Sequence, residues 1–368
     1  MNRRIIGADL LLLITAAVWG FGFVAQRSGM QYVGPFAFNG IRFLLGSLSL
    51  FPLIAWRRRN RLKMESARGG KAQGIIGKQP LNTNSPRAEW IKRKTLFRSS
   101  FLAGTCLFIG VTLQQLGMMA TTAGNAGFIT GLYVVLTPVF GIFLGRKTGK
   151  PTWIAAILTF AGLYLLSSSG IGSMGFNPGD LIVAIGGVFW AFHVLIIDRL
   201  VQSNDPLELS SGQFAFAGIY ALIAAFLVEP LLSSWLGALD PSLLSFAGTS
   251  GLFSWKSLPA LINGLHSGAL PLSLVSSALV PILYGAFGSV GIGYTLQVVA
   301  QKNAPPAHAT IILCLEGCFA ALGGVLLLHE PIGPRTILGF TLMMAGMLIS
   351  QWELISRASA KERFGGVC

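Results

Sequence analysis

Apolar stretches long enough to cross a membrane occupy most of the chain. No charged residue occurs from Ser99 to Gly145 or from Ser257 to Gln301. About 20 apolar residues in a helix cross the hydrocarbon core of a bilayer, so each run has room for two spans, or for a span and a re-entrant segment. The runs lack the alternation of apolar and polar residues that is typical of the strands of a membrane β-barrel. Because lipid offers no hydrogen-bond partner to an open backbone, we expect the spans to be helices.

Ten apolar segments are predicted to be spanning helices. They cover residues 7–26, 34–56, 99–120, 125–145, 151–168, 179–197, 209–228, 278–299, 307–328 and 336–352. The stretch 57–98 is basic and rich in Gly, Asn and Pro, which predicts a flexible loop. The stretch 229–277 is too apolar for a free linker and too interrupted for a clear span. Within it, 231–239 and 243–255 are expected to be interfacial or half-buried helices, with an eleventh span as the alternative.

The chain repeats itself at a slowly growing offset. Asp9-Leu10 followed by Trp19 matches Asp180-Leu181 followed by Trp190, at an offset of 171. The sequence from Phe36 to Ile41 matches that from Phe214 to Ile219, at an offset of 178. Thr112-Leu113-Gln114 matches Thr295-Leu296-Gln297 at 183, an offset that also relates Pro151 to Pro334 and Ser167 to Ser350. Such ordered matches indicate an internal duplication.

Each copy of the duplication holds five helices, so the second copy enters the membrane from the opposite side. This predicts an all-α membrane protein of ten helices in two inverted repeats, an architecture of secondary transporters. The first repeat is assigned to residues 1–170, with the basic loop 57–98. The second is assigned to 178–356, with the insertion 230–277.

The basic residues predict the orientation. With the N-terminus inside, 23 Lys and Arg residues fall on the inner side and three on the outer side, and Arg42 lies within a span. Because Lys and Arg are enriched on the cytoplasmic side, both termini are predicted to be cytoplasmic in a multi-pass protein of the inner or plasma membrane. An eleventh span would move the basic C-terminal residues outside, which disfavours it.

Composition argues against a disordered chain and a soluble enzyme. Hydrophobic residues make up 53% of the chain and charged ones 11%, and the mean hydropathy is +0.67; a soluble domain carries about 25% charge. The net charge of +14 does not indicate nucleic-acid binding, because 13 of the 27 basic residues lie in 57–98. That clustering is typical of a loop beside anionic lipid headgroups. Three of the four cysteines lie in apolar segments, so neither a disulfide framework nor a zinc site is expected.

Several short motifs resemble the EamA-type transporters of the drug/metabolite transporter superfamily. They are Ala17-Val18-Trp19-Gly20, Phe38-Asn39-Gly40-Ile41-Arg42-Phe43, Leu136-Thr137-Pro138-Val139-Phe140, Leu315-Glu316, the run from Phe319 to Gly324, Leu328-His329-Glu330, Gly339 and Ala345-Gly346. Two positions depart from the family pattern. Gly145-Arg146 stands where Gly-Glu is usual, and Gly317-Cys318 lacks the proline often found after Leu-Glu. The resemblance implies ten helices, two repeats and transport of a small polar metabolite or amino acid, often outward.

Glu316 and Arg42 are the ionisable side chains that lie well inside a predicted span. Such groups are costly in a bilayer and are functional candidates by default. Glu316 is predicted to bind a proton or a cationic substrate group, with a structural bond to a neighbouring helix as the alternative. Arg42 can bind a substrate carboxylate through two hydrogen bonds, or can hold helices together by pairing with Glu316 or a carbonyl. Both interpretations of Arg42 stand.

The deeply placed amides are candidates for solute contact. Gln114 and Gln297, from the two Thr-Leu-Gln copies, are predicted to face one cavity from opposite sides of the repeat axis, or to join helices. Asp9 and Asp180 lie near helix starts, where the helix dipole favours a carboxylate, so both are interpreted as caps.

Aromatic side chains and one histidine complete the predicted site. Trp19, Trp190, Tyr133 and Tyr294 are candidates for the wall of a binding cavity, with aromatic packing as the alternative. His193 lies three residues after Trp190, on the same helix face. It is interpreted as a packing residue, with a proton relay as the alternative.

A secondary transporter explains these features best. A membrane enzyme acting on a lipid-linked substrate is the alternative, but the four histidines are scattered at positions 193, 266, 308 and 329. A receptor or scaffold that docks through its basic loop is a third class. The expected partners are a small-molecule solute, membrane lipid and protons, without a cofactor or nucleic acid, and a homodimer is among the expected assemblies.

Overall fold

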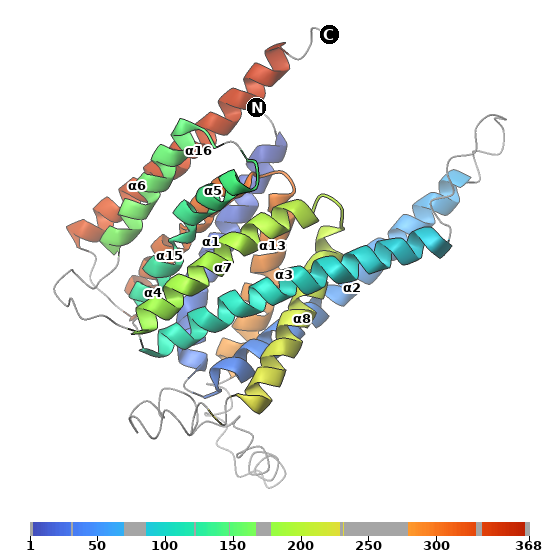
Figure 1. The fold of residues 1–368 in the computed structure, drawn as a ribbon, viewed down its shortest axis with the longest axis horizontal. Coiled ribbons are helices and arrows are strands. Elements are labelled where there is room, and N and C mark those ends of the chain that lie inside the picture. Colours follow the sequence, from blue (N-terminus) through green and yellow to red (C-terminus); the bar gives the residue numbers. More distant parts are fainter. Residues whose placement is uncertain are drawn as a thin grey trace.

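The part of the chain that the structure describes is a bundle of helices without a strand (Figure 1). The computed structural model describes residues 3–30, 32–69, 86–120, 123–146, 148–166, 178–228, 231, 279–328 and 333–364. Apart from residue 231, the helices expected at 231–239 and 243–255 lie outside these residues. So do Ser167, His266, His329 and Glu330.

Every predicted apolar segment is mostly helical where it is described. The first half contains α1 (Arg3–Gly29), α2 (Pro35–Gly69), α3 (Pro86–Ala120), α4 (Ala123–Thr130), α5 (Tyr133–Phe143) and α6 (Lys150–Leu166). The second half contains α7 (Pro178–Leu200), α8 (Pro206–Leu227), the π-helix η1 (Tyr284–Tyr294), which continues into α13 (Thr295–Gln301), then α14 (Pro306–Leu313), α15 (Glu316–Leu328) and α16 (Pro334–Phe364). The sequence pattern predicts the spans but not the π-helical turns of η1.

Six helices in the described residues are long and apolar enough to cross a membrane. They are Ile5–Gly29, Pro35–Arg61, Glu89–Ala120, Pro178–Leu200, Pro206–Leu227 and Leu279–Gln301. The shorter apolar helices are Tyr133–Phe143, Pro306–Ala320 and Ile337–Ser350. This all-helical membrane architecture agrees with the predicted class.

Proline begins many of the helices, because its fixed φ suits the first turn and its missing N–H has no partner there. Pro35, Pro178, Pro206, Pro306 and Pro334 are first residues in this way. The start of α8 is also capped, since Asp205 accepts hydrogen bonds from the backbone N–H groups of Leu207 (3.0 Å) and Glu208 (3.4 Å).

The flexible loop predicted at 57–98 is wrong for 57–69 and 86–98, which are helical. Helix α2 continues to Gly69 and α3 starts at Pro86, so both extend beyond the rest of the bundle in Figure 1. The basic stretch 57–68 consists mostly of Arg, Leu, Lys, Met, Glu and Ala, which are good helix formers. An apolar helix that is already formed can therefore propagate through it.

Ion pairs connect these extensions to each other and to the bundle. Arg58 of α2 lies 3.5 Å from Glu89 of α3, and Arg93 pairs with Glu89 one turn away at 2.7 Å. Arg57 and Arg61 lie 3.6 and 3.8 Å from Asp205, at the start of α8. The composition predicts none of these pairs, because they depend on the helices continuing past the apolar segment.

Two of the predicted spans are interrupted near their middle. Segment 125–145 is divided between α4 and α5, and segment 307–328 between α14 and α15. Tight i to i−3 hydrogen bonds close both interruptions, from Leu132 N–H to the Ile129 carbonyl (3.1 Å) and from Leu315 N–H to the Ile312 carbonyl (3.0 Å). The two interruptions stand 183 residues apart, which is the offset between Gln114 and Gln297.

The interruptions also touch each other. The Cys314 thiol donates to the carbonyl of Gly131 at 3.7 Å, and these two residues are again related by the offset of 183. A structural feature at equal sequence positions in the two halves is therefore in direct contact near the centre of the bundle.

Helix packing in the second half follows that in the first. Helix α3 packs on α7 and α8, while η1 packs on α1 and α2 and α13 packs on α1. Helix α7 packs on α4 and α5, while α1 packs on α14 and α15. The remaining large contacts join α2 to α8 and α6 to α16. This arrangement places nine of the described helices around one central region: α1, α3, α4, α5, α7, η1, α13, α14 and α15.

Candidate functional site

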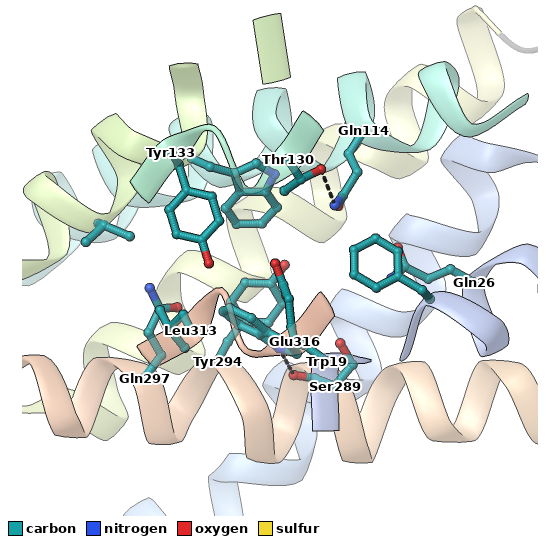
Figure 2. Close-up of a pocket in the computed structure, with 13 residues that line it drawn as sticks. Trp19, Gln26, Gln114, Thr130, Tyr133, Ser289, Tyr294, Gln297, Leu313 and Glu316 are labelled. Atoms are coloured by element: carbon teal, nitrogen blue, oxygen red, sulfur yellow. Dashed lines mark hydrogen bonds between the residues drawn. The ribbon is translucent and has the colours of Figure 1, made fainter. Parts of the chain in front are cut away.

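A pocket of about 450 Å³ lies in this central region (Figure 2). It is lined by Trp19, Phe23, Gln26, Gln114, Thr130, Tyr133, Trp190, Val194, Ser289, Tyr294, Gln297, Leu313 and Glu316. Both halves of the chain contribute. Seven of the nine predicted site residues line the pocket, and Arg42 and His193 do not.

Most of the lining consists of residue pairs at the offsets of the predicted repeat. At 171 residues the pairs are Trp19 with Trp190 and Phe23 with Val194; at 183 residues they are Gln114 with Gln297, Thr130 with Leu313, and Tyr133 with Glu316. Gln26, Ser289 and Tyr294 complete the wall without a paired lining residue. The two halves thus contribute equivalent positions to one cavity, while the side chains at those positions differ.

Glu316 lies directly after the interruption between α14 and α15. It is the first residue of α15, and in Figure 2 its carboxylate lies between Thr130 and Tyr133 on one side and Trp19 and Tyr294 on the other. The residue is 5% exposed. No hydrogen bond or ion pair to this carboxylate is found among the residues that the structure describes.

Gly20 allows α1 to lie directly against this interruption. A Cβ atom at Gly20 would lie 2.6 Å from the Glu316 carbonyl oxygen and 2.5 Å from the Cβ of Phe319. Any larger side chain would therefore push α1 away from α15. Trp19, the neighbour of Gly20, would move with it and leave the pocket wall.

Three aromatic rings form one side of the pocket. Trp19 and Tyr294 have ring centroids 4.5 Å apart, and Trp190 stacks on Tyr294 with centroids 5.9 Å apart and planes inclined by 16°. The Trp19 Nε1–H donates to the Ser289 carbonyl at 3.3 Å, which fixes the indole (Figure 2). The sequence identifies these three rings as candidates, but only the structure shows that they form a single wall.

The polar lining is only partly satisfied. The Gln114 amide nitrogen donates to the Thr130 hydroxyl at 3.1 Å, and the Gln297 amide nitrogen donates to the Gln301 side-chain oxygen at 3.1 Å. The Oε1 atoms of Gln26 and Gln297, the Nε1–H of Trp190 and the hydroxyl of Tyr133 are buried without a hydrogen-bond partner. Because an unpartnered buried polar atom is costly, these atoms are suited to meeting a polar solute.

Sequence reasoning missed Phe23, Gln26, Thr130, Val194, Ser289 and Leu313. Helical periodicity could have found some of them. Phe23 and Gln26 follow Trp19 by four and seven residues, and so lie on the same face of α1. Val194 follows Trp190 by four residues on α7.

Arg42 is buried outside the pocket, at 1% exposure. Its Nε–H donates to Asn39 Oδ1 at 3.0 Å, and its guanidinium lies 5.4 and 5.1 Å from the ring centroids of Phe38 and Phe43. The pairing with Glu316 considered from the sequence does not occur among the described ion pairs.

His193 stands behind the pocket wall. Its Nε2 is 2.9 Å from Gln213 Oε1, which joins α7 to α8, and its ring meets that of Trp190 edge-on with centroids 5.9 Å apart. This geometry supports the position of Trp190.

Two polar clusters lie at the end of the bundle where α1 begins. His308 of α14 contacts Asp9 of α1 through Nε2 (2.8 Å) and Ser350 of α16 through Nδ1 (2.7 Å), and all three residues are buried. Through His308, Asp9 is connected to α14 and α16, a role that its interpretation as a helix cap missed because His308 is distant in sequence. Arg146, after α5, is partly exposed and pairs with Asp198 near the end of α7. Both clusters therefore join helices at that end.

Comparison with known proteins identifies the family. The profile described as "EamA-like transporter family" matches residues 6–168 and 252–351. This chain belongs to the EamA-like transporter family. It is therefore a multi-pass membrane transporter and not an enzyme, as the sequence predicted.

Two relatives of this EamA-type transporter cover nearly its whole length, and a third covers about two thirds of it. An "Uncharacterized transporter" of Archaeoglobus fulgidus is 26% identical over 93% of this chain and 85% of its own length. The "Uncharacterized transporter YwfM" of Bacillus subtilis is 24% identical over 96% and 95%. The "Uncharacterized inner membrane transporter YedA" of Escherichia coli K12 is 23% identical over 66% and 68%.

A solved crystal structure also shares this EamA-type fold. It aligns with a TM-score of 0.61 over 95% of this chain and 98% of the other, at 15% sequence identity. At that identity the likeness concerns the fold alone.

Proposed function

We propose that this chain is a secondary transporter that moves a small polar or amino-acid-like solute across the membrane by alternating access, with export as the expected direction. In this proposal the solute binds in the central pocket, where Trp19, Trp190, Tyr133 and Tyr294 form the wall. Gln114, Gln297 and Glu316 supply polar contacts. Arg42 and His193 act from behind the wall, as positioning residues.

The observation that carries the proposal is the composition of the pocket. Aromatic rings and a few converging polar groups line the pocket, as in small-molecule sites, and residues at equivalent positions of the two halves contribute them. In transporters with inverted repeats, the solute site lies between the repeats, where interrupted helices meet. The interruptions beside Tyr133 and Glu316 are such a place.

The same observations support ten helices in two inverted repeats, assigned to residues 1–170 and 178–356. The interruptions fall at equal positions of the two halves, and the helix contacts of one half recur in the other. An odd number of spans per repeat inverts the second copy. The Lys and Arg distribution supports cytoplasmic termini.

Alternating access fits the asymmetry between the two ends of the pocket. At the end where α1 begins, the Asp9–His308–Ser350 and Arg146–Asp198 contacts join helices, and in this proposal they hold that end closed. The lining extends away from that end along α1, from Trp19 to Gln26. Opening the closed end and closing the other would expose the pocket to the opposite side.

A reconstituted uptake screen tests the transport function. Liposomes containing the purified chain would receive a mixture of small polar metabolites, with and without a pH gradient, and mass spectrometry would measure what enters. We expect at least one solute to accumulate, and Trp190→Leu to reduce its transport at least about tenfold because a lining ring is lost. The matched variant Trp56→Leu changes a tryptophan on the exposed surface of α2, and should transport normally. Equal loss in both variants would contradict the assignment of the pocket.

Cysteine labelling tests the topology. Gln73→Cys and Ser250→Cys should react with an impermeant maleimide from opposite sides of the membrane, with 73 cytoplasmic. Reaction from the same side would overturn the inverted arrangement.

A further inference from the structure

Glu316 is the only charged side chain in the described lining of the pocket. The other lining residues are aromatic, apolar, amide or hydroxyl residues, and none is Lys, Arg or His. Arg42, the buried cation considered for a substrate carboxylate, lies outside this lining with Asn39 and two phenylalanine rings as neighbours. The pocket is therefore suited to compensating a positive charge on a solute and not a negative one.

The surroundings of Glu316 make an unpaired carboxylate costly. The side chain is 5% exposed, and no described side chain pairs with it. A carboxylate removed from water without a counter-charge loses its hydration and gains nothing in return. A cationic solute in the pocket would supply that counter-charge.

The aromatic wall favours the same kind of solute. The rings of Trp19, Trp190 and Tyr294 lie within 6.4 Å of one another, between centroids, and border the same cavity. An ammonium or quaternary ammonium group is attracted to the faces of such rings, most strongly to tryptophan. Rings and a carboxylate together attract an organic cation through two independent effects.

Four polar atoms of the lining are buried without a partner, and none of them carries a positive charge. Gln26 Oε1 and Gln297 Oε1 are oxygens that can receive hydrogen bonds from an ammonium or a hydroxyl group. The Trp190 Nε1–H and the Tyr133 hydroxyl could donate to a solute carboxylate, but as neutral donors they do not compensate its charge. An amino acid would thus bring one charge that the lining compensates and one that it does not.

We infer that the solute of this pocket is an organic cation without a carboxylate, whose ammonium or quaternary ammonium head lies between Glu316 and the rings of Trp19, Trp190 and Tyr294. The inference rests on the proposed transport function and names its substrate class. The competing possibility is that only a proton neutralises Glu316, and that the solute is neutral or zwitterionic.

Matched ligands separate these possibilities. Choline, betaine and 3,3-dimethylbutan-1-ol have similar bulk but are cationic, zwitterionic and neutral. Phenethylamine, phenylalanine and 2-phenylethanol form a second such set with a primary ammonium group. Isothermal titration calorimetry on the purified full chain would measure the Kd of each. We expect the cation of at least one set to bind about tenfold or more tightly than its two counterparts, because a desolvated charge pair and the ring faces act on it alone.

Variants assign the preference to Glu316. Glu316→Gln keeps the shape and should reduce cation affinity at least about tenfold without changing that of the neutral ligand. Glu316→Asp retains the charge and should retain the cation preference. Glu208→Gln, outside the pocket lining on α8, is the matched control and should bind like the unmodified chain. Thermal melting of each variant would confirm that it is folded.

Three results would overturn the inference. They are the absence of binding by both cations, equal binding of the cation and its zwitterionic counterpart, and an unchanged cation preference in folded Glu316→Gln. If any of them occurs while the uptake screen still detects a transported solute, the substrate class is wrong and the transport function stands. If no solute is transported either, the transport function fails with it.

Discussion

At the scale of single residues, we propose that Glu316 determines how the pocket responds to pH. It is the acidic residue of the described lining, and its counterpart in the first half is Tyr133, so the two halves differ where a proton could bind. A carboxylate in such apolar surroundings can take up a proton when the pocket faces one side and release it when the pocket faces the other. This cycle would couple a pH gradient to solute movement.

Glu316→Gln is therefore expected to abolish pH-driven accumulation, while solute exchange persists at solute concentrations above the raised Kd. Glutamine keeps the side-chain volume and its hydrogen-bonding capacity, but it cannot titrate. Transport into proteoliposomes, with and without a pH gradient, checks this, and Glu208→Gln serves as the control for a glutamate outside the pocket. A folded Glu316→Gln protein that still concentrates solute in response to a pH gradient would restrict Glu316 to a structural role.

The sequence predicted pocket-lining residues well where two signals agreed. Trp19, Trp190, Gln114 and Gln297 stand in recognisable repeat copies as well as deep in spans, and all four line the pocket. For Arg42 the sequence indicates depth in the membrane but not direction, and its side chain lies outside the lining. The counterparts of Gln26 and Ser289 in the other half do not line the pocket, so the repeat does not mark these two residues. Only the geometry of the helices reveals them.

At the scale of elements, the two interrupted helices depend on a small side chain at their contact. Cys314 is fully buried and its thiol reaches the Gly131 carbonyl. Any branched side chain larger than cysteine would separate the interruptions, and with them Tyr133 and Glu316.

We expect Cys314→Leu to destabilise the protein by about 1–3 kcal/mol, as overpacking of a full core does, and to reduce transport more than Cys314→Ala. Alanine removes a weak hydrogen bond and leaves the helices in contact. Thermal melting and solute uptake of the two variants provide the comparison. If leucine and alanine have equal effects on uptake, close contact between the interruptions is not required.

Asp205 combines two roles that substitutions can separate. It caps α8 through Leu207 and Glu208, and it lies near Arg57 and Arg61 of the α2 extension. The arginine side chains are about half exposed, at 47% and 54%, so solvent screens these ion pairs and each contributes little.

Asp205→Asn should therefore leave stability nearly unchanged, because asparagine caps a helix as well as aspartate does. Asp205→Ala should cost about 1–2 kcal/mol through the lost cap. Melting temperatures at low and high salt measure the difference. A large, salt-dependent effect of Asp205→Asn would show instead that the ion pairs hold the α2 extension in place.

Hydropathy predicted where the helices lie along the chain, but it did not predict where they end or where they are interrupted. The apolar segment 34–56 marks where α2 meets lipid, but helix-forming basic residues carry the helix on to Gly69. Gly131, a poor helix former, stands at the first interruption, whereas Cys314-Leu315 stands at the second. Hydropathy marks neither interruption, since a continuous helix would present the same apolar pattern.

At the scale of the whole molecule, the repeat offsets predicted which residues share the cavity, but not the polar contacts at one end of the bundle. The partners in the Asp9–His308–Ser350 cluster are up to 341 residues apart in the chain, and no repeat motif contains them. Arg146 stands where the family usually has an acidic residue, and it pairs with Asp198. The first cluster joins helices α1, α14 and α16, and the Arg146–Asp198 pair joins the end of α5 to α7. Both lie on the side that the proposed topology assigns to the cytoplasm.

If these contacts hold the cytoplasmic end closed, weakening them should open the pocket to that side. The reporter is a cysteine placed at Val194 in a background without native cysteines, and an impermeant maleimide is applied from the cytoplasmic face. We expect Arg146→Ala and Asp9→Asn each to accelerate its labelling. Val194 lines the pocket. Loss of about 1 kcal/mol from the closed state would raise the open fraction about fivefold when that fraction is small.

Arg335→Ala is the matched control for this experiment. Arg335 begins α16 at the opposite end and contacts Tyr164 of α6, with its guanidinium 5.8 Å from the ring centroid. Its loss weakens a contact between helices without touching the closed end, so labelling from the cytoplasmic face should not accelerate. Acceleration in Arg335→Ala as well would indicate general loosening of the bundle. Unchanged labelling in folded Arg146→Ala and Asp9→Asn would show that neither cluster is the barrier, and would leave the packed helices themselves as what separates the pocket from the cytoplasm.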